Sequence, residues 1–331
     1  MKKINWAIMG VGDISHKFAK SFKGIEDAQL YAAASRDKSK ADEFAKVYGI
    51  TKAYGSYEEM LKDDQVDLVY VATPNSLHKK HTLACIENGK GVLCEKAFSV
   101  NKVEALVMAS KAREKGTFLM EAMWTRFLPA VKAIEKYIEE GHLGDIRFIK
   151  VNMGYNRPQD PSSRRYNNEL GGGALLDIGV YAMSFITMVK KVSPIEIKSF
   201  GNLTATNVDG DCLSIMKYED GSMAEMLLSI TTHLRRYIEI IGTKGTLLLP
   251  SVNDPRSAAL ITKNNQNEVI EKDYDQPFYT GFEYQIMEAN QCFMNGKIES
   301  DRMPLKETIK IISILDKIRE DIGIVFPNDK I

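Results

Sequence analysis

Apolar runs and amphipathic stretches alternate along the first 120 residues of the chain. A first apolar run starts at residue 4 and ends at a glycine turn, and others cover residues 30–34, 66–72, 91–94 and 117–120. Helical patterns cover residues 16–22, 38–47, 77–88 and 102–115, with Ser76 and Asn101 as expected N-caps. Alternation of this kind predicts an α/β unit, a parallel sheet wound by helices on both faces.

The pattern changes after residue 124. Helical stretches are expected at residues 128–140, 175–189, 282–294 and 306–321, and strands at 145–153, 211–217, 222–229 and 237–241. Residues 219–221 and 242–245 are turn sequences of the kind that join hairpins. We therefore predict a second, α+β domain with a mostly antiparallel sheet, and place the two domains at residues 1–122 and 123–331.

Composition narrows the class of protein. The 331 residues suit two domains, and 44 basic residues balance 44 acidic ones. That balance argues against nucleic acid and against an anionic membrane as partners. No apolar run approaches the roughly 20 residues of a membrane span, and no signal peptide is evident. The four cysteines lack metal-ligand spacing, so we expect reduced thiols, a cytoplasmic protein and no metal.

The glycine turn after the first strand is the clearest chemical signal. Gly10 permits a tight turn, Gly12 leaves room for phosphates, and Ser15 stands where a third small residue is usual. Asp13 and Ile14 complete the turn and open the following helix. In this context the turn predicts binding of a dinucleotide, whose pyrophosphate meets the helix N-terminus. The alternative is an ordinary strand-to-helix turn.

Residues at the end of the second strand bear on which dinucleotide is bound. An acidic side chain there would hydrogen-bond the ribose hydroxyls of NAD, whereas a cation suits the 2′-phosphate of NADP. The chain has Ser35 and Arg36 at this point and Lys40 in the next helix, so NADP is favoured and NAD stays possible. The alternative is a capping serine beside a solvated arginine, and Asp37 weakens the positive field.

Two further strand ends carry polar residues. Thr73, Asn75 and His78 follow one strand, where they could reach a ribose or a nicotinamide, although His78 could equally be a structural cap. Glu95 and Lys96 follow the next strand. A lysine near an oxidised nicotinamide could assist proton transfer, and the alternative is a surface ion pair.

A second constellation lies in residues 171–181. Three glycines precede Asp177 and Tyr181, whose spacing puts both on one face of a helix. The glycines would let this helix approach a cofactor closely. An acid and a phenol with a lysine facing them can relay a proton for an alcohol, whereas the alternative is a half-buried aromatic beside a solvent-facing acid.

Together with residues 120–127, these segments resemble the Gfo/Idh/MocA oxidoreductases, and most closely the branch of dimeric dihydrodiol dehydrogenase and NADP-dependent D-xylose dehydrogenase. The resemblance implies an N-terminal Rossmann domain and a C-terminal domain whose large, open-faced sheet forms a homodimer or homotetramer. Lys96 corresponds to the family's active-site lysine, and Tyr181 takes the place of a histidine, as in that branch. Ala97 replaces the family's proline, so either packing keeps the bend or Lys96 is displaced; a cis bond before alanine is far less favourable than one before proline.

The resemblance also implies a reaction. NADP would lie over the first strand with its nicotinamide facing the second domain. Tyr181 would act as general base on a sugar, trans-dihydrodiol or related cyclic polyol, with Lys96 promoting its ionisation and Asp177 positioning the substrate. The nicotinamide end and the substrate are expected to meet aromatic and cationic side chains: Trp124, Arg126, Tyr155, Phe278 and Tyr279. Reduction of a carbonyl or imine would use the same residues in reverse, and an NADP(H)-binding regulator without turnover is the alternative function.

Overall fold

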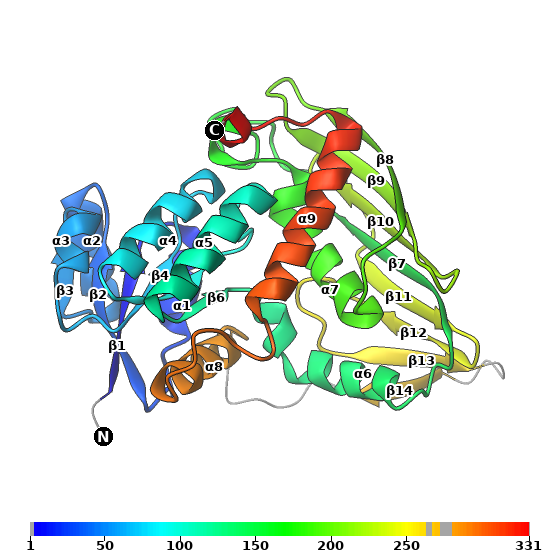
Figure 1. Ribbon diagram of the computed structural model, residues 1–331, viewed down its shortest axis with the longest axis horizontal. Coiled ribbons are helices and arrows are strands. Elements are labelled where there is room, and N and C mark those ends of the chain that lie inside the picture. Colours follow the sequence, from blue (N-terminus) through cyan, green and yellow to red (C-terminus); the bar gives the residue numbers. More distant parts are fainter. Residues whose placement is uncertain (1–2, 263–266, 272–279, 331) are drawn as a thin grey trace. The chain divides into compact units, whose positions relative to one another are not determined.

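The computed structural model describes residues 3–262, 267–271 and 280–330, which form two compact units (Figure 1). Unit 1 consists of Met1–Trp124 and Gln276–Ile309, and unit 2 of Thr125–Asp275 and Lys310–Ile331. The division predicted from the sequence assigned the whole segment after residue 122 to the second domain. In the structure the Trp6 indole donates to Asn290 at 2.8 Å, so the late helix α8 (Glu283–Met294) belongs to unit 1.

Unit 1 contains a six-stranded parallel sheet in the order β3-β2-β1-β4-β5-β6. Its strands are β1 (Ile4–Met9), β2 (Ala28–Ala34), β3 (Lys52–Tyr54), β4 (Leu68–Val71), β5 (Gly91–Cys94) and β6 (Leu119–Glu121). Its helices are α1 (Asp13–Lys20), α2 (Lys38–Tyr48), α3 (Tyr57–Leu61), η1 (Asn75–Leu77), α4 (His78–Glu87), α5 (Lys102–Lys115) and α8. The predicted parallel sheet, wound by helices, is confirmed.

Local signals explain several helix ends in unit 1. The Asn101 side chain accepts from Glu104 N at the start of α5, and Gly116 ends that helix in the left-handed conformation. The prediction of Ser76 as an N-cap was wrong, because a 3₁₀ turn occupies Asn75–Leu77 and α4 begins only at His78. β3 and α3 were not foreseen, since each is too short to show a period.

Unit 2 is built on an eight-stranded sheet in the order β14-β13-β12-β11-β7-β10-β9-β8. Its strands are β7 (Ile146–Gly154), β8 (Glu196–Leu203), β9 (Asp209–Lys217), β10 (Met223–Ser229), β11 (Tyr237–Gly242), β12 (Gly245–Leu249), β13 (Ala258–Thr262) and β14 (Asn267–Glu271). Its helical segments are η2 (Trp124–Phe127), which begins at the boundary, α6 (Pro129–Glu139), η3 (Asn168–Leu170), η4 (Leu175–Gly179), α7 (Val180–Lys190) and η5 (Pro327–Lys330); α9 (Leu305–Ile322) begins in unit 1 and continues here. β10 pairs in parallel with β7, and the other neighbours are antiparallel, which confirms the mostly antiparallel sheet.

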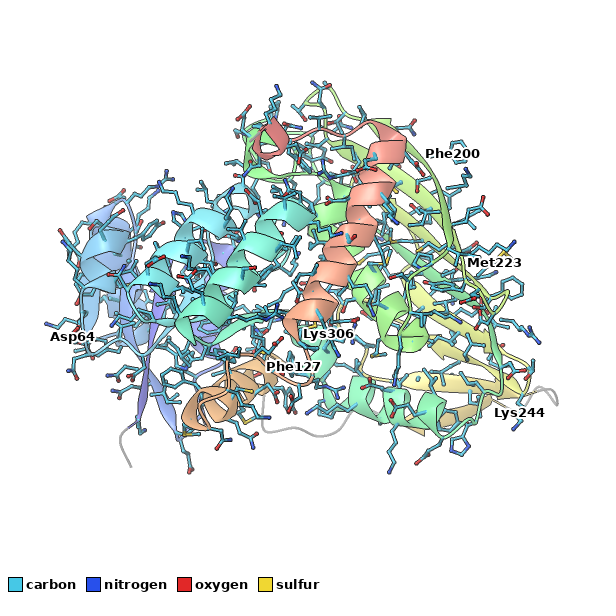
Figure 2. The ribbon with its side chains drawn as sticks, in the orientation of Figure 1. Asp64, Phe127, Phe200, Met223, Lys244 and Lys306 are labelled. Carbon is cyan, nitrogen blue, oxygen red and sulfur yellow. The ribbon has the colours of Figure 1, made fainter. Side chains whose placement is uncertain are left out.

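The two faces of the unit 2 sheet differ. Ile149, Val151 and Met153 of β7 point to one face and are buried, and Figure 1 shows α7 over that face. The opposite face exposes Phe200 and Met223, which Figure 2 shows on the side away from α7. The alternation of buried and exposed positions along β9 and β10 follows from this one-sided cover.

One described segment, Asn168–Lys190, is long and apolar enough to cross a membrane, contrary to the prediction that no such run exists. Buried positions make up 94% of its most apolar window. The segment is apolar on all sides because it lies inside unit 2, as expected for a core helix. The four cysteines are free and buried.

Candidate active site

The glycine turn after β1 has the backbone that a dinucleotide site requires. Gly10 has φ +95°, and a Cβ there would lie 3.1 Å from Ala72 O. A Cβ on Gly12 would meet no atom within 4 Å, so space is open at the start of α1. The N-cap of α1 is Gly12, which has no side chain to cover the N-terminus of the helix. Open space and backbone N–H groups at a helix N-terminus fit a pyrophosphate.

Ser15 supports this turn from inside. Its side chain is fully buried, and its hydroxyl donates to Gly10 O at 2.6 Å. The small residue at this position therefore stabilises the tight turn, while Asp13 is exposed and Ile14 is half-buried beside it.

Cationic side chains lie at the end of β2. Arg36 and Lys40 are exposed, and the half-buried Ser35 accepts from Asp37 N at 3.2 Å. Asp37 is the N-cap of α2 and accepts from the backbone and hydroxyl of Ser39 at 3.0 and 2.6 Å. Those hydrogen bonds lower the pKa of Asp37.

The end of β4 is buried. Thr73 and Asn75 are 9% and 8% exposed. The ring of His78 is fully buried, and its two nitrogens lie 2.8 Å from Ala97 O and 2.7 Å from Thr73 O. His81 is also buried and contacts Thr73 Oγ1 at 2.9 Å; burial lowers its pKa to about 4.

The end of β5 holds the predicted Glu95–Lys96 pair. Glu95 is buried and accepts a hydrogen bond from the Tyr70 hydroxyl, and Lys96 is half-buried. The Lys96–Ala97 peptide bond is cis, and Ala97 is fully buried. Of the two alternatives that the sequence left for alanine at this position, the structure has the retained bend.

The two residues expected at the nicotinamide end fall in different units. In unit 1, Trp124 packs against Phe282 with ring centroids 5.1 Å apart, and the Lys17 ammonium lies 3.8 Å from the Trp124 ring. In unit 2, the Arg126 guanidinium is 7% exposed and donates to the hydroxyl and carbonyl oxygen of Ser184 at 2.8 and 2.6 Å. These contacts give Arg126 a role in anchoring α7.

Asp177 and Tyr181 lie at the start of the core helix of unit 2. The segment Leu175–Gly179 has π-helical hydrogen bonding and continues into α7, so the expected uninterrupted α-helix was wrong here. π-turns inside α-helices frequently occur at functional sites. Asp177 is buried and Tyr181 is half-buried.

Two arginines that the sequence analysis missed hold Asp177. Arg164 Nη2 donates to one carboxylate oxygen and Arg165 Nε to the other, each at 3.1 Å. Tyr155 lies within the field of Asp177; burial and then that charge raise the pKa of Tyr155 to about 12. The arginines lie in an irregular loop whose sequence carries no periodic signal.

Asp209, at the start of β9, is a third residue that the sequence did not reveal. Its buried carboxylate accepts from Leu175 N at 2.6 Å, and burial raises its pKa to about 7. A Cβ on Gly173 would lie 2.0 Å from Asp209 Oδ1, and one on Gly172 2.6 Å from Arg165 O. The glycines expected to admit a cofactor are thus required for packing inside unit 2.

The predicted aromatic residues Phe278 and Tyr279 lie outside the described residues. The remaining residues form two sets. Unit 1 offers an open glycine turn, a cationic strand end and Lys96; unit 2 offers Tyr181 beside an arginine-held carboxylate. A phosphate-binding turn, a lysine and a phenol are the groups that a dehydrogenase of alcohols needs.

Two family models match the chain. The model described as "Oxidoreductase family, NAD-binding Rossmann fold" matches residues 4–123. The "GFO/IDH/MocA C-terminal domain" matches residues 131–248.

Full-length relatives are similar over the whole chain. Trans-1,2-dihydrobenzene-1,2-diol dehydrogenase of Mus musculus is 34% identical over 334 residues, 99% of each chain. The enzyme of that name from Homo sapiens is 36% identical over 335 residues, again 99% of each.

Solved structures share the fold. Aldose-aldose oxidoreductase from Caulobacter crescentus, complexed with glycerol, superimposes with a TM-score of 0.87 at 22% identity, covering 97% of each chain. The 3-ketoreductase KijD10 from Actinomadura kijaniata, in complex with NADP and TDP-benzene, gives 0.87 at 23% identity over 97% of this chain and 98% of that one.

Proposed function

The chain belongs to the GFO/IDH/MocA oxidoreductase family, and from this premise we propose that it oxidises a hydroxyl carbon of a trans-dihydrodiol, sugar or related cyclic polyol with NADP. The observation that carries the proposal is the similarity to the dihydrodiol dehydrogenases over 99% of both chains. Similarity at this level supports the reaction class, a dehydrogenase of CH–OH groups that uses a nicotinamide cofactor.

Residues of unit 1 suit the cofactor. Gly10, Gly12 and the start of α1 would hold the pyrophosphate, because open space and backbone N–H groups lie there. Arg36 and Lys40 would hold the 2′-phosphate, since both are exposed cations and the Asp37 carboxylate is engaged as the cap of α2. When bound, the nicotinamide supplies the acceptor for the hydride of the hydroxyl carbon.

The chain's own residues would move the proton. Tyr181 accepts the proton of the substrate hydroxyl at its phenolic oxygen, acting as general base. Lys96 stabilises the negative charge that develops on the oxygens of this reaction. Asp177, fixed through both oxygens by Arg164 and Arg165, orients a neighbouring hydroxyl of the substrate. Reduction of the product runs through the same groups in reverse.

The assembly that we propose is a homodimer or homotetramer in which a second copy covers the open face of the unit 2 sheet. This open face is defined by Phe148, Phe200, Leu213, Ile215 and Met223, which are 38–75% exposed. Strand pairing sets Phe200 opposite Leu213 and Met223 opposite Phe148, in two rows of this face with the row of Lys150, Glu225 and Ile215 between them. Large exposed apolar side chains gathered on one sheet face mark protein contacts.

The test of the proposed function is nicotinamide absorbance during incubation of the protein with NADP and a panel of aldopyranoses, inositols and trans-dihydrodiols. Turnover of one class establishes the enzyme and its substrate class together. Tight NADP binding without any turnover, in either direction, would instead favour a regulator of the same fold.

A further inference from the structure

His78 has contacts that the proposed chemistry does not use. Its side chain is fully buried at the start of α4. Nε2 lies 2.7 Å from Thr73 O, in the loop after β4, and Nδ1 lies 2.8 Å from Ala97 O, the carbonyl of the residue that follows Lys96. One ring therefore connects the ends of two neighbouring strands of the unit 1 sheet.

The partners determine the charge of this ring. Carbonyl oxygens only accept hydrogen bonds, and both distances are hydrogen-bond lengths. A neutral imidazole has one N–H, so donation from both nitrogens requires the imidazolium form. Burying a cation is costly unless its hydrogen bonds are made, and here both are made to buried backbone oxygens.

The ionisable neighbours are compatible with one cation at this place. His81 lies on the same helix, and burial lowers its pKa to about 4, so its ring is neutral. On the loop after β5, Glu95 precedes Lys96 and accepts from Tyr70. On α5, the nearly buried Glu104 pairs with Lys79 of α4 at 3.1 Å.

We propose that His78, as an imidazolium, is a positioning residue for Lys96. By holding the carbonyl of Ala97, the residue after Lys96, against the loop after β4, the ring fixes the backbone from which the lysine side chain extends. The inference rests on the proposed function for its consequence, since Lys96 is the active-site lysine there. Displacement of a catalytic group by about 1 Å can cost about 100-fold in rate.

The charge of the ring is tested on the unmodified protein by ¹⁵N NMR of its five histidines, with and without NADP. The other four resonances are assigned by single substitutions of those histidines. We expect both ring nitrogens of His78 to be protonated at pH 8. A nitrogen without a proton would overturn the imidazolium assignment.

The positioning role is tested with His78→Phe, which keeps a ring and removes both donors. We expect kcat to fall about 10- to 100-fold, with a smaller change in KM. The rate at which an acylating reagent modifies Lys96, followed by mass spectrometry relative to Lys80, should change at least about threefold, by the same displacement. His78→Gln, which keeps one donor, should restore part of both.

His81→Phe is the matched control, because the ring of His81 lies on the same helix and contacts Thr73 Oγ1 and the ring of Tyr57. It should leave the relative acylation of Lys96 as in the unmodified protein. If His78→Phe also leaves that ratio unchanged, the positioning role is wrong. Absence of turnover by the unmodified protein would defeat the proposed function, whereas NMR and acylation would still decide the role of His78.

Discussion

At the scale of single residues, the clearest feature of the site in unit 2 is how the carboxylate of Asp177 is held. Each carboxylate oxygen of Asp177 receives a hydrogen bond from an arginine, so its charge and orientation are fixed. Tyr181 is half-buried. It lies on the helical segment at whose start Leu175 N donates a hydrogen bond to the Asp209 carboxylate. The two hydrogen bonds suit Asp177 to a positioning role, and we propose Tyr181 as the group that exchanges a proton with a substrate.

Tyr181→Phe tests that assignment. Removing a positioned general base should lower kcat about 10²- to 10⁴-fold, because the substrate hydroxyl then loses its proton acceptor. The measurement is NADPH formation with the substrate found in the panel. Tyr137→Phe, on α6 in the same unit, is the control and should keep its activity; unchanged turnover of Tyr181→Phe would exclude the proton-transfer role.

Arg36→Ala tests the cofactor preference. Loss of a charge-assisted hydrogen bond to a phosphate should weaken NADP binding about 10- to 100-fold and leave NAD binding nearly unchanged. Dissociation constants for both cofactors can be measured by fluorescence titration. Lys46→Ala, an exposed cation at the other end of α2, serves as the control. Equal losses for NAD and NADP would remove the 2′-phosphate argument.

At the scale of elements, the start of the core helix of unit 2 is determined by close backbone approach. Gly173 has φ +106° and lies against Asp209, and Gly172 lies against the carbonyl oxygens of Arg164 and Arg165. The same loop supplies the arginines that bind Asp177. Glycines, loop and buried acid therefore form one packing arrangement that positions the residues of the site.

Gly173→Ala should disrupt this arrangement. The added Cβ meets Asp209 Oδ1 at 2.0 Å in a backbone conformation that alanine avoids, so both clash and strain destabilise the fold. Gly221→Ala is the matched control, since Gly221 also has positive φ but open space around it. Denaturant unfolding should show a loss of about 1–2 kcal/mol for Gly221→Ala and a clearly larger one for Gly173→Ala. Equal losses would contradict the packing role.

Asp209 should make the stability of the fold depend on pH. Its pKa is raised by burial from 3.8 to about 7. Between these values the unfolded chain releases the proton and the folded protein keeps it, so the free energy of unfolding falls as pH rises from about 4 to 7. Urea unfolding across this range should show a shallower fall for Asp209→Asn. The exposed Asp64, labelled in Figure 2, provides the control Asp64→Asn, which should keep the slope of the unmodified protein.

At the scale of the whole molecule, the helices of unit 2 leave the open face of its sheet uncovered (Figure 1). Helix α7 covers the opposite face (Figure 1), and the exposed apolar side chains lie on β7, β8, β9 and β10. A monomer seldom exposes so many large apolar side chains on one sheet face. A second copy of the chain, placed on this face, would bury them.

The double variant Phe200→Glu, Met223→Glu tests the assembly. Two carboxylates on the open face should oppose its burial, so the mass by light scattering should fall to that of a monomer. Val107→Glu, an exposed apolar residue on α5 of unit 1, is the control and should keep the mass of the unmodified protein. A monomeric unmodified protein, or an unchanged mass for the double variant, would show that this face does not assemble.

The sequence by itself determined the longer helices and strands and the change from an α/β to an α+β pattern, because turn glycines, caps and the period of apolar residues act over a few neighbouring positions. It was sufficient to predict the parallel sheet of unit 1, the mostly antiparallel sheet of unit 2 and the family. The cations at Arg36 and Lys40 could be proposed for the same reason, since they follow a recognisable strand end.

Only the tertiary structure decided which residues distant in the sequence contact one another. Residues far apart in sequence meet only through packing. Asp209 accepts a hydrogen bond from Leu175 N, His78 contacts Ala97 O, and α8 packs in unit 1. The burial of the apolar segment Asn168–Lys190 follows from the same packing, and so does the hydrogen bond from Arg126 to Ser184 of α7. A local pattern does not encode the partner of a side chain, because the free energy of that contact depends on which distant surface the fold brings to it.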